Sequence, residues 1–355
     1  MNRPRLKTTT EVFTSPDGEL CLLRPSAEAD LVLEGAGARG RALVARLDGS
    51  SERAELETEF GDGVVGELLD LLEGEELVED VGAYESLSAA ELGRYDRQLR
   101  YFADVAPSGV SAPDCQRLLR EAHVVVLGVG GLGTWTALSL ACCGVGRLTL
   151  YDGDDVELSN LNRQVLFSED DIGEPKAGAA ASALRRFNPG VAVDAVVRTL
   201  ASEQEIRGAV SGASLVVDAA DRPAHDIERW VNSACFAEGV PYVTMSHFPP
   251  FARVGPLYVP GETGCFNCQE RAYRTSYELY DHLVDQRRGS PSPAATLGPV
   301  CAFVGGQVAL DVVHQLTALC EPASKGSVRV FDTRTLELSA EPVPRDPGCD
   351  VCSGR

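Results

Sequence analysis

The sequence predicts an α/β protein built on a doubly wound parallel sheet, and three observations lead to that fold class. Two apolar runs, Val124–Leu127 and Leu148–Tyr151, are typical of buried strands, and an apolar helical segment separates them. Three glycines follow the first run in G-x-G-x-x-G spacing: Gly128, Gly130 and Gly133. The second run ends in an acidic residue, Asp152. This order of strand, glycine turn, helix, strand and acid predicts a Rossmann-like nucleotide-binding sheet.

The residues before this sheet predict a smaller α+β module. Residues 9–24 are typical of a β-hairpin, with TEVFT and ELCLLRP on the two sides of a Ser-Pro-Asp-Gly turn. Helical segments are expected near 36–47, 52–60 and 63–73, separated by glycine-rich turns. Residues 76–80 are expected to form a short closing strand.

This arrangement resembles the PqqD-like winged-helix modules that recognise leader peptides. The resemblance depends on the LLRP strand, the Leu-Asp-Gly after the first helix and the terminal EGEELVED. It implies that residues 1–83 bind a peptide that pairs along an exposed sheet edge. The alternative is a structural or dimerising appendage.

The glycine turn and Asp152 predict contacts to a nucleotide. Glycines let the backbone approach a phosphate at the N-terminus of the following helix. A carboxylate at the end of the second strand can accept hydrogen bonds from a ribose hydroxyl. A hydride-transferring enzyme that uses NAD would need the same features, so the pattern alone leaves the chemistry open.

The segment after Asp152 favours cleavage of a phosphoanhydride. Residues 159–164 (Ser-Asn-Leu-Asn-Arg-Gln) bring polar and cationic groups to the strand end, and Lys176 follows in Gly-Glu-Pro-Lys. Hydride transfer needs little positive charge at the phosphates. Breaking the bond between the α- and β-phosphates needs it, because charge builds on the departing pyrophosphate.

Four motifs together resemble the ThiF/MoeB adenylyltransferases: GVGGLG, YDGDDVELSNLNRQ, DIGEPKA and DAADR, in the family's order and spacing over residues 92–355. The resemblance implies an ATP-dependent adenylyltransferase that releases pyrophosphate. Its expected nucleotide-binding residues are Gly128, Gly130, Gly131, Gly133, Asp152 and Asp154. Its expected catalytic residues are Arg97, Asn160, Arg163, Lys176 and Asp221.

The motif LGRYDRQ at residues 92–98 matches the family's N-terminal element, whose second arginine is here Arg97. The resemblance implies that Arg97 reaches the ATP bound by a second copy of the chain, and therefore a homodimer. Residues 84–122 are expected to be a linker that carries this helix, and residues 123–355 the adenylation domain with its C-terminal zinc knuckles.

The chain after the glycine turn continues the alternation of helix and strand. Residues 177–187 are expected to form a helix, and residues 191–199 and 214–218 two further strands. Asp221 lies just beyond the last of these strands, where sites in such sheets gather, and is placed to hold Mg²⁺ at the triphosphate. The family has Asp-Asn here, whereas this chain has Asp221-Arg222. The resemblance therefore does not predict which residues form the acceptor end of the pocket.

Two C-x-x-C pairs predict a structural zinc site. Cys265 and Cys268 form one pair, and Cys349 and Cys352 the other. Four thiolates complete a closed tetrahedral Zn²⁺ site that ties the C-terminus to the domain. A redox dithiol would need one pair in a thioredoxin-like context, which neither pair has.

The stretch between these pairs contains no acceptor cysteine for a thioester. Residues 270–296 are expected to be a polar, partly ordered crossover loop. Cys301 begins an apolar segment that is expected to pack as a core helix. His247 and His282 are expected to be structural.

The composition excludes some partners. A formal net charge of −21 and a pI near 4.6 argue against nucleic-acid binding, although they suit a basic peptide. No apolar run approaches the ~20 residues of a membrane span, and the N-terminus lacks a signal-peptide core. Eleven cysteines, several within apolar segments, favour the reducing cytoplasm.

Three functions are consistent with the sequence. The favoured one is adenylation of the C-terminal carboxyl or carboxamide of a ribosomally made precursor peptide, because the whole chain resembles ThiF proteins of ribosomal-peptide maturation, such as enzymes of the microcin C type. The second is activation of a ubiquitin-like sulfur carrier for molybdopterin or thiamine synthesis. The third is a non-catalytic leader-binding scaffold in a cyclodehydratase or thiopeptide pathway, which would not need the Arg, Asn, Lys and Asp set.

Overall fold

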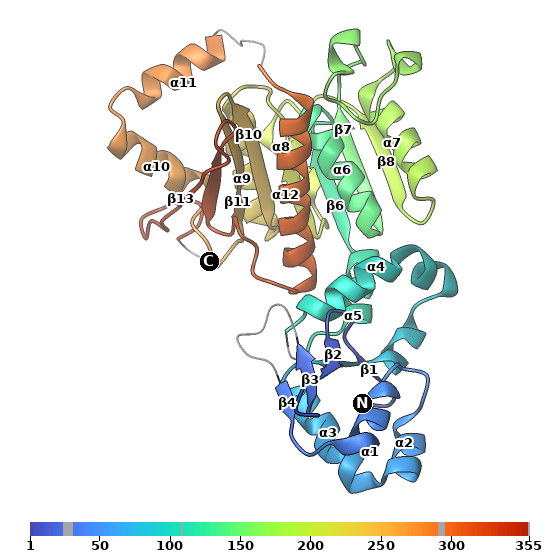
Figure 1. Cartoon of the computed structure of the whole chain (residues 1–355). Helices are drawn as coiled ribbons and strands as arrows, with labels where there is room; N and C mark the ends of the chain where they lie inside the picture. Colours follow the sequence, from blue (N-terminus) through green and yellow to red (C-terminus); the bar gives the residue numbers. More distant parts are fainter. Residues whose placement is uncertain (24–30, 108, 290–294, 354–355) are drawn as a thin grey trace. The chain divides into compact units, whose positions relative to one another are not determined.

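The computed structural model describes residues 1–23, 31–107, 109–289 and 295–353, in two compact units, residues 1–117 and 118–355 (Figure 1). Arg24 and Pro25 of the predicted hairpin, and residues 290–294 of the predicted crossover loop, lie outside the described residues.

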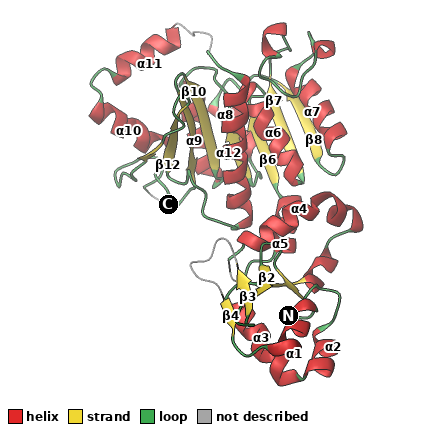
Figure 2. Ribbon diagram, in the orientation of Figure 1, coloured by secondary structure: helices red, strands yellow, loops and turns green. Residues whose placement is uncertain are grey.

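Small antiparallel sheets and short helices make up the described part of the N-terminal unit (Figure 2). One sheet has the strand order β2-β3-β4, and the other pairs β1 with β5. The strands are β1 (Pro4–Leu6), β2 (Glu11–Thr14), β3 (Leu20–Leu23), β4 (Leu31–Leu33) and β5 (Val78–Asp80). The helices are α1 (Gly37–Ala45), α2 (Arg53–Phe60), α3 (Asp62–Gly74), the 3₁₀ turn Val81–Ser86, α4 (Ala89–Val105) and α5 (Ala112–Glu121), which continues into the second unit.

One apolar cluster holds the small sheet against the three short helices. Leu22 of β3 packs with Leu43 of α1, Leu56 of α2 and Leu72 of α3, and each is at most 1% exposed. Burying such side chains contributes about 1.5–3 kcal/mol each. The predicted hairpin, three helices and closing strand are confirmed, whereas β1 and β4 had no prediction.

The C-terminal unit is built on a mixed sheet with the strand order β13-β12-β11-β10-β9-β6-β7-β8. Strands β10, β9, β6, β7 and β8 are parallel, and the remaining three run antiparallel to their neighbours. The strands are β6 (His123–Leu127), β7 (Arg147–Asp152), β8 (Ala192–Val197), β9 (Leu215–Asp218), β10 (Tyr242–Phe248), β11 (Phe251–Tyr258), β12 (Ser327–Asp332) and β13 (Leu338–Pro342). The chain order reverses between β6 and β9, and such switch points are where ligands bind in doubly wound sheets.

Helices cover both faces of this sheet. Its helices are α6 (Gly131–Cys143), α7 (Lys176–Phe187), α8 (Glu203–Val210), α9 (Asp226–Glu238), α10 (Phe266–Ser276), α11 (Tyr280–Gly289) and α12 (Gly298–Thr317). Helices α6, α7 and α12 line the near face in Figure 1, while α8 and α9 pack together on the far face. Because both faces are covered, the buried residues of β6 and the first three residues of β9 are apolar, which matches the predicted runs.

The predicted core helix that contains Cys301 is confirmed as α12. Cys301, Val304, Val308 and Val312 are each at most 1% exposed, and the helix packs along α6. By length and composition α12 could cross a membrane, in contrast to the prediction that no run approaches a span. Half of its apolar window is buried within the fold, as in a core helix.

The predicted crossover loop 270–296 is wrong over most of its length, because α10 and α11 occupy it. Two polar side chains of α10 are buried against polar partners. Gln269 accepts a 2.6 Å hydrogen bond from Tyr258. Glu270 contacts His225 and Arg229, which lie at the start of α9. A helix whose inner face is polar shows no apolar stripe, and its sequence therefore resembles a loop.

Candidate active site

The glycine turn after β6 is shaped by close backbone contacts. Gly128 has φ +87°, and a Cβ on it would lie 2.7 Å from the carbonyl oxygen of Ala219, just after β9. A Cβ on Gly133 would lie 2.0 Å from the carbonyl oxygen of Gly128. A Cβ on Gly130 would meet no atom within 4 Å, so open space faces the first turn of α6. The backbone N–H groups of that turn can donate to a phosphate.

Asp152, at the carboxyl end of β7, is joined to this turn by its carboxylate. One oxygen accepts from the Val129 N–H at 2.7 Å, and the other accepts from the Asp154 N–H at 2.9 Å. Burial raises the pKa of Asp152, although the hydrogen bonds and Lys176 oppose that shift. The predicted ribose ligand thus lies beside the glycine turn.

The loop at residues 158–164 brings its arginine to the same turn. The Asn160 side chain is buried, and its amide oxygen accepts from the Glu157 N–H at 3.0 Å, which closes a 3₁₀ turn. A Cβ on Gly131 would lie 3.4 Å from both Cγ and Cδ of Arg163, so the stem of this side chain packs closely against the turn. Arg163 donates to the Ser159 carbonyl at 2.7 Å. It has no carboxylate partner within the described residues, so its charge is available to an anion.

Lys176 begins α7 and is almost fully buried. Its ammonium lies 2.9 Å from a carboxylate oxygen of Asp154, whose side chain is largely exposed. Backbone hydrogen bonds between residues 154–156 and 173–176 hold the two residues together. Asp154 therefore contacts the site through Lys176, and an incoming phosphate would compete with it for that ammonium.

Asp221 lies three residues after the end of β9 and is exposed. Its side chain makes no hydrogen bond or ion pair with the rest of the described chain. The segment after it is anchored by His225, whose Nε2 lies 2.9 Å from Oε1 of Glu270 in α10. Arg229 also donates to both oxygens of Glu270. Although burial raises the pKa of Glu270, His225 and Arg229 lower it to about 2.

Asp218, the last residue of β9, was not among the predicted site residues. Its side chain is 4% exposed, and one oxygen accepts only a 3.3 Å hydrogen bond from the Ala220 N–H. Burial, and then the nearby Glu228 carboxylate, raises the pKa of Asp218 to about 8. A charged residue at the end of the apolar run 214–218 was the signal that could have identified it.

The raised pKa of Asp218 predicts a pH-dependent stability. The unfolded chain loses this proton near pH 3.8, whereas the folded protein keeps it to about pH 8. The stability that protonated Asp218 contributes is therefore lost as pH rises through this window. We expect Asp218→Asn to raise the melting temperature more at about pH 9 than at about pH 5. An equal difference between variant and wild type at both pH values in thermal melts would contradict this expectation.

Cys301 lies beneath the glycine turn, and a Cβ on Gly131 would be 2.9 Å from its sulfur. The thiol is 1% exposed and lies 3.2 Å from the Thr296 hydroxyl. Nδ1 of His247 contacts the same hydroxyl at 3.3 Å. These contacts suit the packing roles expected for Cys301 and His247.

Arg97 belongs to the N-terminal unit, whereas the other expected site residues belong to the C-terminal unit. It lies on α4, and its side chain is 89% exposed. Its nearest carboxylate is that of the adjacent Asp96, at 3.6 Å. Its charge is thus exposed to solvent.

The predicted metal ligands form one buried cluster. Cys265, Cys268, Cys349 and Cys352 are each at most 2% exposed, and their sulfurs all lie within 4.8 Å of one another. The Cys265–Cys349 and Cys268–Cys352 sulfur pairs are 3.5 and 3.4 Å apart. A tetrahedral ZnS₄ centre with ~2.3 Å bonds requires separations of about 3.8 Å. The cluster therefore fits zinc, and its separations are too long for disulfides.

A comparison with protein families agrees with this geometry, since residues 95–351 match the ThiF family. The chain belongs to the ThiF family. It is 34% identical over 261 residues to the sulfur carrier protein ThiS adenylyltransferase of Escherichia coli, covering 74% of this chain and 95% of that protein. It is 32% identical to the E. coli molybdopterin-synthase adenylyltransferase, covering 75% and 98%.

Solved structures extend the likeness to nearly the whole ThiF-family chain. Two structures of the Microcin C7 biosynthetic enzyme MccB match with a TM-score of 0.77 and 25% identity, over 99% of this chain and 100% of theirs. One, from E. coli, holds AMPCPP and selenomethionine MccA, and the other holds N-formylated MccA. These relatives and the site geometry identify the protein as an ATP-dependent adenylyltransferase.

Proposed function

We propose that this enzyme adenylates the C-terminal carboxyl or carboxamide of a ribosomally made precursor peptide during maturation of a peptide natural product. The N-terminal unit is the observation that supports this function. The first 94 residues precede the ThiF match at residues 95–351, yet the structural likeness to MccB covers 99% of the chain. An added peptide-recognition module has a use in an enzyme that acts on a precursor peptide.

Activation of a small sulfur-carrier protein is the second candidate. It is favoured by the 34% and 32% identity to the two E. coli adenylyltransferases, which are covered almost completely. Those matches span about three quarters of this chain, so this candidate gives the N-terminal unit no role.

The third candidate, a non-catalytic scaffold, is the weakest. Arg163 packs against Gly131, the buried Lys176 pairs with Asp154, and Asp221 is exposed beyond β9. A protein that only bound a leader peptide would not need these groups at one end of the sheet.

In the proposed reaction the glycine turn and the ends of the parallel strands hold ATP. Gly128, Gly130, Gly131 and Gly133 shape the turn whose N–H groups contact phosphate, and Asp152 binds the ribose. Asn160, Arg163 and Lys176 hold and neutralise the phosphates, and Asp154 positions Lys176. We assign Mg²⁺ to Asp221 because its carboxylate is exposed and unpartnered among the described residues.

The chemistry requires neither a general base nor a covalent nucleophile for a carboxylate acceptor. The carboxylate oxygen attacks the α-phosphorus, and the bond from that phosphorus to the bridging oxygen breaks. Pyrophosphate leaves with the bonding electron pair. Positioning and charge neutralisation therefore carry catalysis.

Further assignments belong to the same proposal. Residues 1–83 form the peptide-recognition module, residues 84–122 the linker, and residues 123–355 the adenylation domain. Arg97, which is exposed, contacts the ATP of a second copy in a homodimer. The four-cysteine cluster holds structural Zn²⁺, and eleven cysteines without a disulfide among them suit a cytoplasmic enzyme.

Deleting residues 1–83 tests the function proposed for the module. We expect the apparent KM for a full-length precursor peptide to rise about 100-fold, because binding one end of a peptide raises the effective concentration of its other end. Exchange of labelled pyrophosphate into ATP with a short C-terminal acceptor at saturating concentration should persist. If the deletion leaves the activity with both acceptors unchanged, the sulfur-carrier candidate is favoured. Loss of activity with both acceptors would mean that the module builds the acceptor pocket or the dimer.

A further inference from the structure

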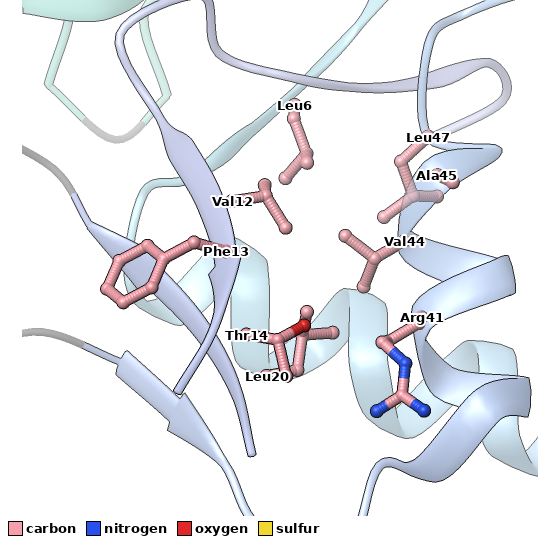
Figure 3. A pocket seen from close by; sticks show the side chains of 9 residues that line it. All are labelled: Leu6, Val12, Phe13, Thr14, Leu20, Arg41, Val44, Ala45 and Leu47. Atoms are coloured by element: carbon pink, nitrogen blue, oxygen red, sulfur yellow. The ribbon is translucent and has the colours of Figure 1, made fainter. Parts of the chain in front are cut away.

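A groove between β2 and α1 runs along the open edge of the small sheet, and Figure 3 shows the side chains that line it. It encloses about 400 Å³. The sheet order places β2 at an edge, paired with β3 alone. All four residues of β2, Glu11–Thr14, are exposed.

The edge of β2 can accept another strand. In an antiparallel pair, alternate residues direct their N–H and C=O groups away from the partner strand, here toward the unpaired edge of β2. Figure 3 shows the Val12 side chain directed toward α1 and the Phe13 side chain directed away from it. This alternation is the pattern against which a peptide strand pairs.

The interior of the groove is apolar over most of its length. Val44 of α1 and Leu47, which follows the end of α1, line one side of the groove and are each 3% exposed. Val12 lies opposite and is 43% exposed, so its methyl groups still contact water. An aliphatic side chain placed between Val12 and Val44 would bury this surface, at about 25 cal/mol per Å².

Arg41 gives one end of the groove a positive charge. In Figure 3 its guanidinium lies beyond Val44, next to Thr14 and Leu20, and Leu6 lies at the other end. Within the described residues it donates a 3.3 Å hydrogen bond to the carbonyl of Gly18 and forms no ion pair. Acidic residues outnumber basic ones across residues 1–83, so Arg41 is a positive charge within a unit of negative net charge.

We propose that the groove selects one short sequence pattern in its peptide, an acidic residue two positions from an aliphatic one. The peptide adds to β2 as an extended strand, with the aliphatic side chain between Val12 and Val44 and the carboxylate on Arg41. Side chains two residues apart share one face of a strand and are ~6.7 Å apart, a spacing that spans one helical turn of α1. This inference rests on the proposed function, since it specifies the precursor segment that the module recognises.

Titration of fluorescein-labelled octapeptides against the full-length protein tests the pattern without ATP. The probes are Lys-Thr-Glu-Thr-Leu-Thr-Thr-Lys, the same peptide with Glu and Leu exchanged, and versions with Gln or Lys in place of Glu. The two orders cover both strand directions. We expect one Glu probe to bind at least about tenfold more tightly than its Gln version, the scale of one charge-assisted hydrogen bond.

Charge reversal separates recognition from a structural role. Arg41→Glu should weaken binding of the Glu probe and tighten binding of the Lys probe, and Arg41→Gln should remove the Glu preference if the reversed variant does not fold. Arg46→Gln is the matched control, because it removes a cation of the same region that pairs with Glu59 instead. Equal affinities of Glu and Gln probes for the wild type, or no saturable binding of either, would overturn the proposal. Since the titration contains no ATP, its failure would leave the adenylation assay unaffected.

Discussion

Replacement of Arg163 by alanine is expected to reduce acceptor-dependent exchange of pyrophosphate into ATP at least about 100-fold. That is the scale for removing one preorganised group that stabilises charge in a transition state. The stem of Arg163 packs on Gly131, and its guanidinium has no carboxylate partner in the described chain. Its positive charge can therefore act on the pyrophosphate that leaves. Asp221→Ala should cause a loss of the same size, because the carboxylate expected to hold Mg²⁺ is removed.

Arg147→Ala is the matched control for this experiment. Arg147 begins β7, at the opposite end of the strand from Asp152, and pairs with Asp194 on the exposed surface. It should exchange pyrophosphate at the wild-type rate. A folded Arg163→Ala or Asp221→Ala protein with wild-type exchange would show that the site is assigned wrongly.

The second large effect concerns the four-cysteine cluster. We expect one zinc per chain by elemental analysis. Cys352→Ser should lose that zinc and reduce the free energy of unfolding by about 4 kcal/mol or more, as loss of a metal site does. The cluster joins the C-terminal segment to α10, and its sulfurs are buried, so the change also leaves a polar hydroxyl in an apolar place.

Cys320→Ser provides the control, since Cys320 is only partly buried and lies outside the cluster. It should keep its zinc and melt within a few degrees of the wild type. If the wild-type protein had the same melting temperature after its zinc was removed as before, the structural site would be refuted.

The sequence predicted the central part of the sheet because its local signals agree with the fold. The apolar runs at β6, β7 and β9 are buried on both faces, and the glycines lie where a Cβ would collide with Ala219 or Gly128. The strands β10–β13 and the helices α10 and α11 were not predicted. Their side chains are stabilised by partners distant in the sequence, such as Tyr258 with Gln269 and Glu270 with His225.

The candidate site was predicted in part. The residues of the glycine turn, Asp152, Arg163 and Lys176 lie at one end of the sheet, where the motif spacing placed them. The roles of the individual residues remain predictions. Asp218 was not predicted as a site residue because its raised pKa depends on burial. The burial of a single carboxyl is set by the surrounding fold and not by its neighbours in the sequence.

The identity of the acceptor tests the central claim most directly. Pyrophosphate exchange should be measured with short candidate precursor peptides and, in parallel, with a sulfur-carrier protein that ends in Gly-Gly. We predict exchange that depends on the peptide and is lost when its C-terminal residue is removed, with a peptide–AMP adduct visible by mass spectrometry. Exchange supported by the sulfur carrier and not by the peptide would contradict peptide adenylation.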